Sequence, residues 1–498
     1  MSGSARNTLV GLLGLALLLR VLGHVGSGLW LDEIWTLVDF GRLPFGKLIT
    51  TFGTDNNHPL YSLLSWLSLH AFGESAWALR LPALLFGVAS IGALYVYARR
   101  VTTEREALIA ALLLCASYHH VWFSQNARGY TLLLFFTLAS THFLEDLFEG
   151  RKKGSIFPYA VTLALGTYAH LTAIFVALAH AAVYAHVLLW KNERQKVPAQ
   201  ARLWPLYGLL LGGVSSAALH APLLADMLAF FTQPGGGHGK VQSQWTSPWW
   251  TIAEIARSLG FGLLPGLLLL GSALVVLAAG SLSYAKQSLP RVLLFLLPGV
   301  FGAVVMIGLG RHLWPRFFFF QAGFIVLIVV RGLRVLAQLV SGVVASAQRE
   351  RAERVLFQLA LAALSLAWLA ILPRAYLLPK QDFDGAQQYV QSVRKPGEVV
   401  LTAGLASMPY ERYYASDFVA VKTVSDLEQA LSGKTGAYVL STLPTFLTSR
   451  EPELADQLAT RAHEVKRFAG SVGDGDVIVL RIEPNQVARL SHVSGDPP

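Results

Sequence analysis

The stretch GLLPGLLLLGSALVVLAAG, residues 262–280, contains no charged side chain. As a helix rising about 1.5 Å per residue, it would span roughly 28 Å, close to the roughly 30 Å of hydrocarbon in a bilayer. A similar run covers residues 206–224. The whole chain has 498 residues, of which 54% are hydrophobic and 14% charged, whereas soluble domains carry about 25% charged residues. These features predict a polytopic α-helical membrane protein.

We predict about eleven transmembrane helices of roughly 20 residues each. They are expected near residues 8–26, 76–98, 106–122, 129–148, 155–169, 171–190, 204–224, 262–284, 290–309, 317–330 and 355–378. The first resembles a secretory signal, but no A-x-A cleavage site follows it, so we interpret it as a retained span. Segments 58–71 and 248–260 are amphipathic or rich in tryptophan, which is typical of helices that lie in the membrane interface.

The distribution of basic residues predicts the orientation of these spans. The net charge of +10 could suggest a nucleic-acid partner, but the basic residues gather in short loops between spans, so we expect none. One set of loops is the richer and is predicted to be cytoplasmic; it includes Arg99, Arg100, Arg105, Arg151, Lys152, Lys153, Lys191, Arg194, Lys196, Arg202, Lys286 and Arg291. The N-terminus is then cytoplasmic, and the protein is expected to be a multi-pass protein of the plasma (inner) membrane.

The C-terminal part of the chain differs from the rest. The segments GEVVLTAG, DFVAVKTV, AYVLST and DVIVLRI read as strands, and FDGAQQYVQSVRK and EPELADQLATRAHEV (451–465) read as helices. We therefore predict a membrane domain over residues 1–379 and a small extracytoplasmic α/β domain over 380–498. The glycines within 235–239 predict a mobile loop, either a lid or a plain connector.

Two adjacent acids in GLWLDEIWTL, residues 28–37, are the first candidates for chemistry. Asp32 and Glu33 follow the first predicted span and lie between Trp30 and Trp35. Such a pair can simply mark the membrane boundary in solvent. A carboxylate in a partly dry site, however, gains basicity, which suits a general base. The apolar flanks favour this second interpretation.

Polar residues from other predicted outer turns add to this pair. They occur in DNNHPLYSLL (55–64), FSQNARGYTLL (123–133), TYAHLTAIF (167–175) and RHLWPRFFFF (311–320). Taken singly, a histidine here is more often a packing group, and an arginine at a span end can snorkel to the interface. Arginines outside the membrane run against the usual charge bias, and a phosphate partner would explain them because guanidinium groups match phosphate oxygens.

The order of these motifs, an acid pair after the first span followed by HPLY, SQNARGY, YAH and WPRFF, resembles the polyprenyl-phosphate-dependent glycosyltransferases with the GT-C fold. The closest group is glycosyltransferase family 39, which includes protein O-mannosyltransferases and is related to the aminoarabinose transferases that modify lipid A. The resemblance covers roughly the first 330 residues and is strongest over 28–131.

The resemblance implies a reaction and its residues. An acceptor hydroxyl on a lipid, glycan or protein would attack a sugar carried on a polyprenyl phosphate, at the outer face of the membrane and usually with inversion. Asp32 would be the base, with Glu33 supporting it, and Arg128 and Arg316 would bind the leaving phosphate. Further residues would line the site: His58, Tyr61, Tyr130 and His170.

Two departures from the family pattern bear on the mechanism. Relatives often read H-P-P-L-Y, but here His58, Pro59 and Leu60 follow one another directly. Relatives often carry an acid two residues before the arginine of the second outer turn, where this chain has Asn126. A carboxylate pair that could hold a divalent cation is therefore incomplete, so we favour a metal-independent enzyme and keep a divalent metal as the alternative.

The sequence is compatible with two other classes of function. A transporter or flippase of a lipid-linked envelope precursor would place ionisable groups near mid-membrane, whereas most acids of the predicted membrane domain fall at span ends or in loops. A membrane-anchored binding protein would not explain the polar residues that converge from the first half of the chain. The sequence thus favours a membrane glycosyltransferase, and it does not identify the sugar or the acceptor.

Overall fold

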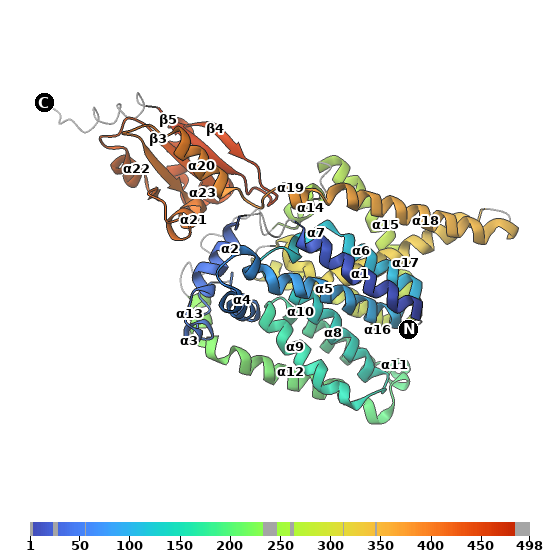
Figure 1. The fold of residues 1–498 in the computed structure, drawn as a ribbon. Coiled ribbons are helices and arrows are strands. Elements are labelled where there is room, and N and C mark those ends of the chain that lie inside the picture. The colour runs from blue at the N-terminus through green and yellow to red at the C-terminus, as the bar shows by residue number, and fades with distance from the viewer. Residues whose placement is uncertain are drawn as a thin grey trace.

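The computed structural model describes residues 3–22, 28–54, 56–232, 247–258, 263–311, 313–343 and 346–483. A body of helices carries a small α/β domain at one end, and the N-terminus lies toward the opposite end of the body (Figure 1). The glycine-rich segment 235–239, for which a mobile loop was predicted, lies outside the described residues.

The first half of the helical body holds the elements that carry most of the candidate residues. These are α1 (Gly3–Val21), α2 (Leu31–Trp35), the π-helix η1 (Thr36–Gly41), α3 (Phe45–Leu48), α4 (Pro59–Phe72), α5 (Ala76–Val101), α6 (Glu104–Ala116), α7 (Tyr118–Ser124), α8 (Tyr130–Phe148), α9 (Ile156–Ala169) and α10 (Ala173–Leu189).

The second half of the body continues with α11 (Lys191–Lys196), α12 (Trp204–His220), α13 (Leu224–Thr232), α14 (Pro248–Ser258), α15 (Leu263–Gln287), α16 (Leu289–Gly308), the 3-10 helix η6 (Pro315–Gln321), α17 (Ala322–Ser341), α18 (Ser346–Ile371) and α19 (Arg374–Leu377). Within the described residues, every predicted span overlaps one of these helices or a pair of them; residues 23–26 of the first predicted span lie outside the described residues.

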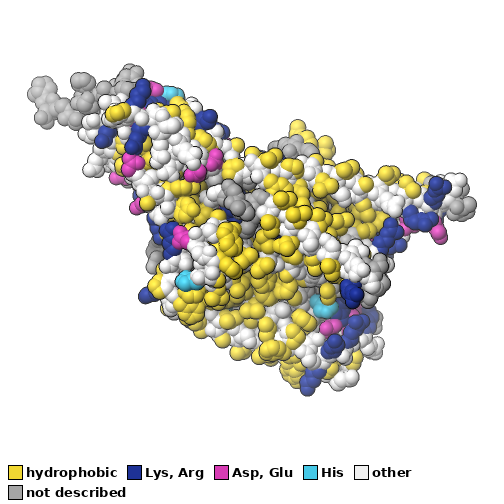
Figure 2. All heavy atoms as spheres, in the orientation of Figure 1, with side chains coloured by type: hydrophobic (Ala, Val, Ile, Leu, Met, Phe, Trp, Pro, Cys, Tyr) yellow, Lys and Arg dark blue, Asp and Glu magenta, His cyan; other side chains and the backbone are white. Residues whose placement is uncertain are grey.

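Length and composition qualify fewer than eleven of these helices as membrane spans. Among the described residues, seven are long and apolar enough to cross a bilayer, or eight when the bent pair α6 and α7 counts as one span. The predicted count of eleven is therefore not confirmed, because helices such as α9, with 14 residues, are shorter than the about 20 that a full crossing needs. Apolar side chains cover the middle of the body, and Lys and Arg gather near its N-terminal end and on the α/β domain (Figure 2).

The break between α6 and α7 shapes the region in front of α8. The two helices meet at an angle of 61°, where Ser117 has extended backbone and caps α7. Such a break leaves helix carbonyls without their usual partners. The buried Arg20 supplies donors: both of its terminal nitrogens lie 3.3 Å from the carbonyl oxygen of Cys115, and its Nε donates to the hydroxyl of Ser124 at 3.1 Å. Arg20 thus stabilises the bend that leads to the turn before α8.

The α/β domain contains a five-stranded sheet in the order β2-β1-β3-β5-β4. Strands β1 (Val399–Ala403), β2 (Val419–Val421) and β3 (Ala437–Thr442) are parallel, whereas β4 (His463–Phe468) and β5 (Val477–Ile482) join antiparallel. The helices are α20 (Phe383–Val393), α21 (Ser407–Arg412), α22 (Val424–Leu431), α23 (Pro444–Arg450) and α24 (Pro452–Arg461).

The four predicted strands and both predicted helices are present, with one error. The helix predicted over 451–465 ends at Arg461, and the chain then forms β4 from His463. This strand lies at the edge of the sheet, and most of its side chains are exposed on both faces. It therefore lacks the alternation of apolar and polar residues by which a half-buried strand is recognised.

Candidate active site

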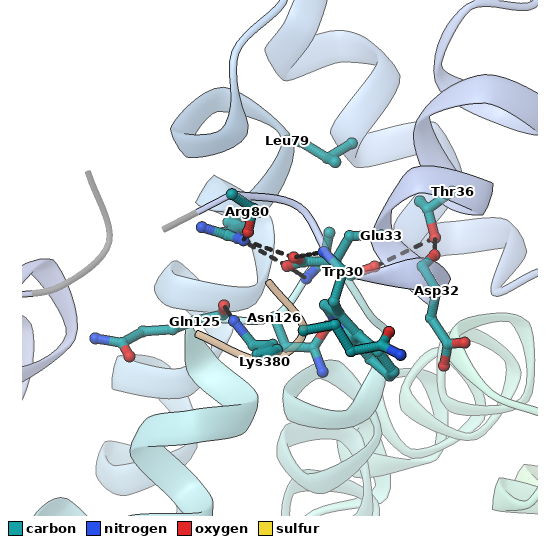
Figure 3. A network of polar contacts seen from close by, with 12 residues as sticks. Trp30, Asp32, Glu33, Thr36, Leu79, Arg80, Gln125, Asn126 and Lys380 are labelled. Atoms are coloured by element: carbon teal, nitrogen blue, oxygen red, sulfur yellow. Dashed lines mark hydrogen bonds and ion pairs between the residues drawn. The ribbon is translucent and has the colours of Figure 1, made fainter. Parts of the chain in front are cut away.

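The short helix α2 presents its two acids in different directions. Successive residues of a helix point about 100° apart. Figure 3 shows the carboxylate of Asp32 pointing away from the contacts that surround Glu33. Both residues are buried, with 6% of Asp32 and none of Glu33 exposed. The neighbouring acids therefore occupy two separate environments.

Glu33 lies in a buried ion pair with Arg80, which comes from the first turns of α5. The Nε and Nη2 atoms of Arg80 donate to the two carboxylate oxygens at 2.7 and 2.6 Å, and the N–H of Ala127 donates at 2.8 Å. Burial raises the pKa of the Glu33 carboxyl, but the charges of Arg80 and Lys380 and these hydrogen bonds outweigh it and lower the pKa to about 2. Glu33 is therefore ionised and fully engaged.

Asp32 faces two arginines from distant parts of the chain. Its Oδ2 accepts a hydrogen bond from Nη1 of Arg316 at 3.2 Å and lies 3.9 Å from Nε of Arg128. The hydroxyl of Thr36 donates to the Asp32 backbone carbonyl at 2.8 Å, one turn further along. The carboxylate is thus fixed in position, close to both guanidinium groups, and largely shielded from solvent.

The turn between α7 and α8 fixes Arg128. Its Nη1 donates to the carbonyl oxygen of Asn56 at 2.5 Å, while its buried Nε has no hydrogen-bond partner among the described residues. The following residue must be small, because a Cβ at Gly129 would lie 2.4 Å from the carbonyl oxygen of Ala169 and 2.9 Å from Nδ1 of His58. The tight contact at Gly129 therefore packs the Arg128 turn against the end of α9 and the residue before α4.

Arg316 reaches the same place from η6, where its guanidinium carbon lies 3.9 Å from the centre of the Trp314 ring. Its Nε is also buried without a hydrogen-bond partner in the described part of the chain. Two guanidinium groups with unused N–H donors face one carboxylate oxygen. Because an unsatisfied buried donor costs about 1–3 kcal/mol, this arrangement is suited to an anion with several oxygens.

A cluster of rings lies next to Arg128. The ring centres of His58 and His170 are 4.5 Å apart, and Tyr130 lies 5.5 and 5.1 Å from them. Nδ1 of His58 is 3.2 Å from the carbonyl oxygen of Ala169, which can only accept, so we assign the ring proton to Nδ1 and a lone pair to Nε2. In the described residues, this Nε2 and the Tyr130 hydroxyl have no hydrogen-bond partner.

Both histidines of this cluster are neutral. Burial, the charge of Arg128 and the neighbouring His170 lower the pKa of His58 well below its usual value. Burial and then the two guanidinium groups lower the pKa of His170 to about 3. The cluster therefore supplies hydrogen-bonding groups beside the arginines without adding positive charge at neutral pH.

The structure thus brings six of the eight predicted residues into one neighbourhood: Asp32, Arg128, Arg316, His58, Tyr130 and His170. Glu33 and Tyr61 lie on another side of α2. The Tyr61 hydroxyl donates to the carbonyl oxygen of Leu79 at 2.6 Å, which connects α4 to α5 beside the Glu33 ion pair.

Residues 379–381 form a connecting segment, the strap, that joins the α/β domain to this region and that the sequence did not lead us to predict. Lys380 is buried and donates from Nζ to the carbonyl oxygen of Gln125 at 2.6 Å, close to Glu33 (Figure 3). The side-chain oxygen of Gln381 accepts the N–H of Leu31 at 3.1 Å. Residues 379–381 therefore contact both segments that present Asp32 and Arg128. Lys380 could have been noticed only as a lone lysine at the predicted domain boundary.

The described residues contain no group of three or more His, Cys, Asp or Glu side chains that could hold a metal ion. Asn126, which stands where relatives often carry an acid, uses its side-chain oxygen to accept the Trp30 indole N–H at 3.0 Å. At this position the amide therefore joins α2 to the Arg128 turn.

This architecture, a helical membrane body with acids and arginines gathered beneath a small C-terminal domain, is the GT-C fold, and the predicted fold class is confirmed. A family model described as dolichyl-phosphate-mannose-protein mannosyltransferase matches residues 56–224, about a third of the chain. This segment runs from the loop before α4 to α13 and includes Arg128 and His170.

Particular solved structures share the fold over nearly the full length. ArnT from Cupriavidus metallidurans in the apo state has a TM-score of 0.56 and 14% identity, with 100% of both chains covered; the same protein bound to undecaprenyl phosphate has a TM-score of 0.52 and 12% identity, again over 100% of both. The Archaeoglobus fulgidus oligosaccharyltransferase AglB, in complex with an inhibitory peptide and a dolichol-phosphate, has a TM-score of 0.52 and 13% identity over 96% of this chain and 74% of its own. A comparison with curated protein sequences finds no match.

Proposed function

We propose that this protein is a membrane glycosyltransferase that moves a sugar from a polyprenyl-phosphate donor to an acceptor hydroxyl. The observation that carries the proposal is the position of Asp32, whose buried carboxylate lies 3.2 and 3.9 Å from two guanidinium groups with unused donors. Undecaprenyl phosphate and a dolichol-phosphate are the lipids named for two proteins that share the fold.

The chemistry follows from these groups. The acceptor oxygen attacks the anomeric carbon of the sugar, and Asp32 takes the hydroxyl proton as general base. The bond between that carbon and the phosphate oxygen breaks, and the prenyl phosphate leaves with the electron pair. Its negative charge rises as the bond breaks, and Arg128 and Arg316 stabilise it. A single displacement of this kind inverts the configuration at the anomeric carbon.

The other predicted residues support this centre. His58, Tyr130 and His170 are placed to bind polar groups of the donor, because their rings lie beside Arg128 and two of their polar atoms have no protein partner among the described residues. Glu33 fixes α2 through Arg80 and so positions Asp32. We place the α/β domain and the site on the extracytoplasmic side of the plasma membrane, since the loops at the other end of the body are richer in Lys and Arg.

A transporter or flippase is less favoured by the position of the site. Buried guanidinium nitrogens without a hydrogen-bond partner occur among the described residues on both sides of the body, in Arg128 and Arg316 and also in Arg202 and Arg331. Unpartnered donors alone therefore do not separate the two functions. Asp32 and its two arginines lie together at one end of the bundle, whereas transporters usually place ionisable groups near mid-membrane, so this position fits chemistry at an interface better than passage across the bilayer.

The test compares cells that lack the gene and carry wild-type protein, Asp32→Asn or the matched control Asp456→Asn, whose side chain is exposed on α24. Mass spectrometry of envelope lipids, glycans and proteins should find a sugar-modified molecule with the wild type and the control. It should be missing with Asp32→Asn, and prenyl-linked sugar should accumulate. An unchanged envelope in Asp32→Asn cells, at equal protein level, would remove Asp32 from the base role.

A further inference from the structure

The ion pair between Asp32 and Arg316 places the proposed base and a proposed phosphate ligand in direct contact. Among the described residues, both contacts of the carboxylate with arginine fall on one oxygen, Oδ2. A lone pair that accepts a hydrogen bond from Arg316 cannot also accept the proton of an acceptor hydroxyl. The contact seen here therefore engages the carboxylate oxygen that faces the two proposed phosphate ligands, while Oδ1 keeps its own lone pairs.

The two arginines differ in how firmly they are held. Arg128 has a side chain only 4% exposed and donates to the backbone of Asn56, so it forms a fixed part of the site. Arg316 has a side chain 23% exposed, and in the described residues it contacts the Asp32 carboxylate, the face of the Trp314 ring and, at 5.8 Å, the Phe317 ring. Arg316 can therefore exchange its anionic partner without breaking a contact to the backbone.

We propose that Arg316 exchanges partners during the reaction: it first holds Oδ2 of Asp32, and the donor phosphate then takes it over and frees that oxygen to accept the hydroxyl proton. A phosphate offers more oxygens than the single Oδ2 atom and suits a guanidinium fork. The proposal rests on the proposed function and adds to it that binding of the donor frees the Asp32 oxygen that faces the two arginines.

The test measures the affinity of purified protein in nanodiscs for farnesyl phosphate, with farnesol as the control that lacks the phosphate. Asp32→Asn should bind farnesyl phosphate more tightly than wild type, on the order of ten-fold, because the phosphate no longer competes with a charged partner for Arg316. The control Asp456→Asn should bind like wild type, and the affinity for farnesol should be the same throughout.

A double-mutant cycle separates exchange from plain repulsion between carboxylate and phosphate. In an Arg316→Gln background, or in Arg316→Met if the first variant does not fold, the gain from Asp32→Asn should disappear. A gain that persists there, or unchanged or weaker binding by Asp32→Asn alone, would overturn the exchange while leaving the glycosyltransferase proposal intact. If farnesyl phosphate binds no better than farnesol in every variant, wild type included, both proposals fail.

Discussion

Lys380 should make the stability of the protein depend on pH in a window where few other groups titrate. Its ammonium is buried in the strap, and this burial, partly opposed by Glu33, lowers the pKa to about 7. An unfolded chain would show the ordinary lysine value of about 10.4. Between these two values the unfolded state holds a proton that the folded state has lost, so the free energy of unfolding rises with pH.

The size of the effect follows from the two pKa values. From pH 7 to pH 9, the difference in bound protons integrates to about 2 kcal/mol. With an unfolding entropy of about 2.1 cal/mol/K per residue, this corresponds to a rise of about 2 °C in the unfolding midpoint for a chain of this length. Lys380→Met removes the titrating group and should flatten the profile. The loss of the hydrogen bond to Gln125 adds only an offset that does not depend on pH.

The assay follows thermal unfolding by tryptophan fluorescence in nanodiscs at pH 7, 8 and 9. Lys434→Met serves as the matched control, because Lys434 is exposed on the α/β domain and its removal should leave the wild-type slope unchanged. The informative quantity is the difference in slope between variants, in which the titration of all other groups cancels. Parallel profiles for wild type and Lys380→Met would refute the assigned burial of the ammonium.

Two further substitutions test the packing around the site. Gly129→Ala should reduce sugar transfer on the order of ten-fold or more, because the new Cβ would lie 2.9 Å from Nδ1 of His58. Gly213→Ala is the matched control, because a Cβ at that position meets nothing within 4 Å. Equal activities of the two variants in the envelope assay would contradict the argument. Glu33→Gln removes the carboxylate charge opposite Arg80, where neither side chain is exposed, so unfolding should become easier by about 3–5 kcal/mol. Replacing Arg80 by Met in the same chain should recover most of that loss in thermal unfolding, and a stable single variant would count against the pair.

The sequence predicts the helices well because long apolar runs have few alternatives to a helix in a bilayer. The run that begins at residue 262 lies almost wholly within α15, and the predicted span 129–148 coincides with α8. The number of crossings is harder to predict. Ser117 breaks one predicted span by 61°, and that angle depends on donors from Arg20, a residue 97 positions earlier that local periodicity cannot connect to it.

The site could be predicted only in part for the same physical reason. Each of Asp32, Arg128 and Arg316 follows or begins an apolar run, so each could be placed at an end of the bundle from the sequence. The partner of Glu33, by contrast, is Arg80, 47 residues away. Only tertiary packing decides that Glu33 is fully engaged by Arg80 while Asp32 faces Arg128 and Arg316.

The strap at residues 379–381 has a practical consequence for anyone who shortens this protein. A cut made at the predicted boundary, after residue 379, would remove Lys380 and Gln381 together with the sheet, and with them the donor to the Gln125 carbonyl and the acceptor of the Leu31 N–H. The peptide immediately before Asp32 would lose its support. Inactivity of such a truncated protein would therefore report damage to the base itself, and it would say nothing about what the sheet recognises.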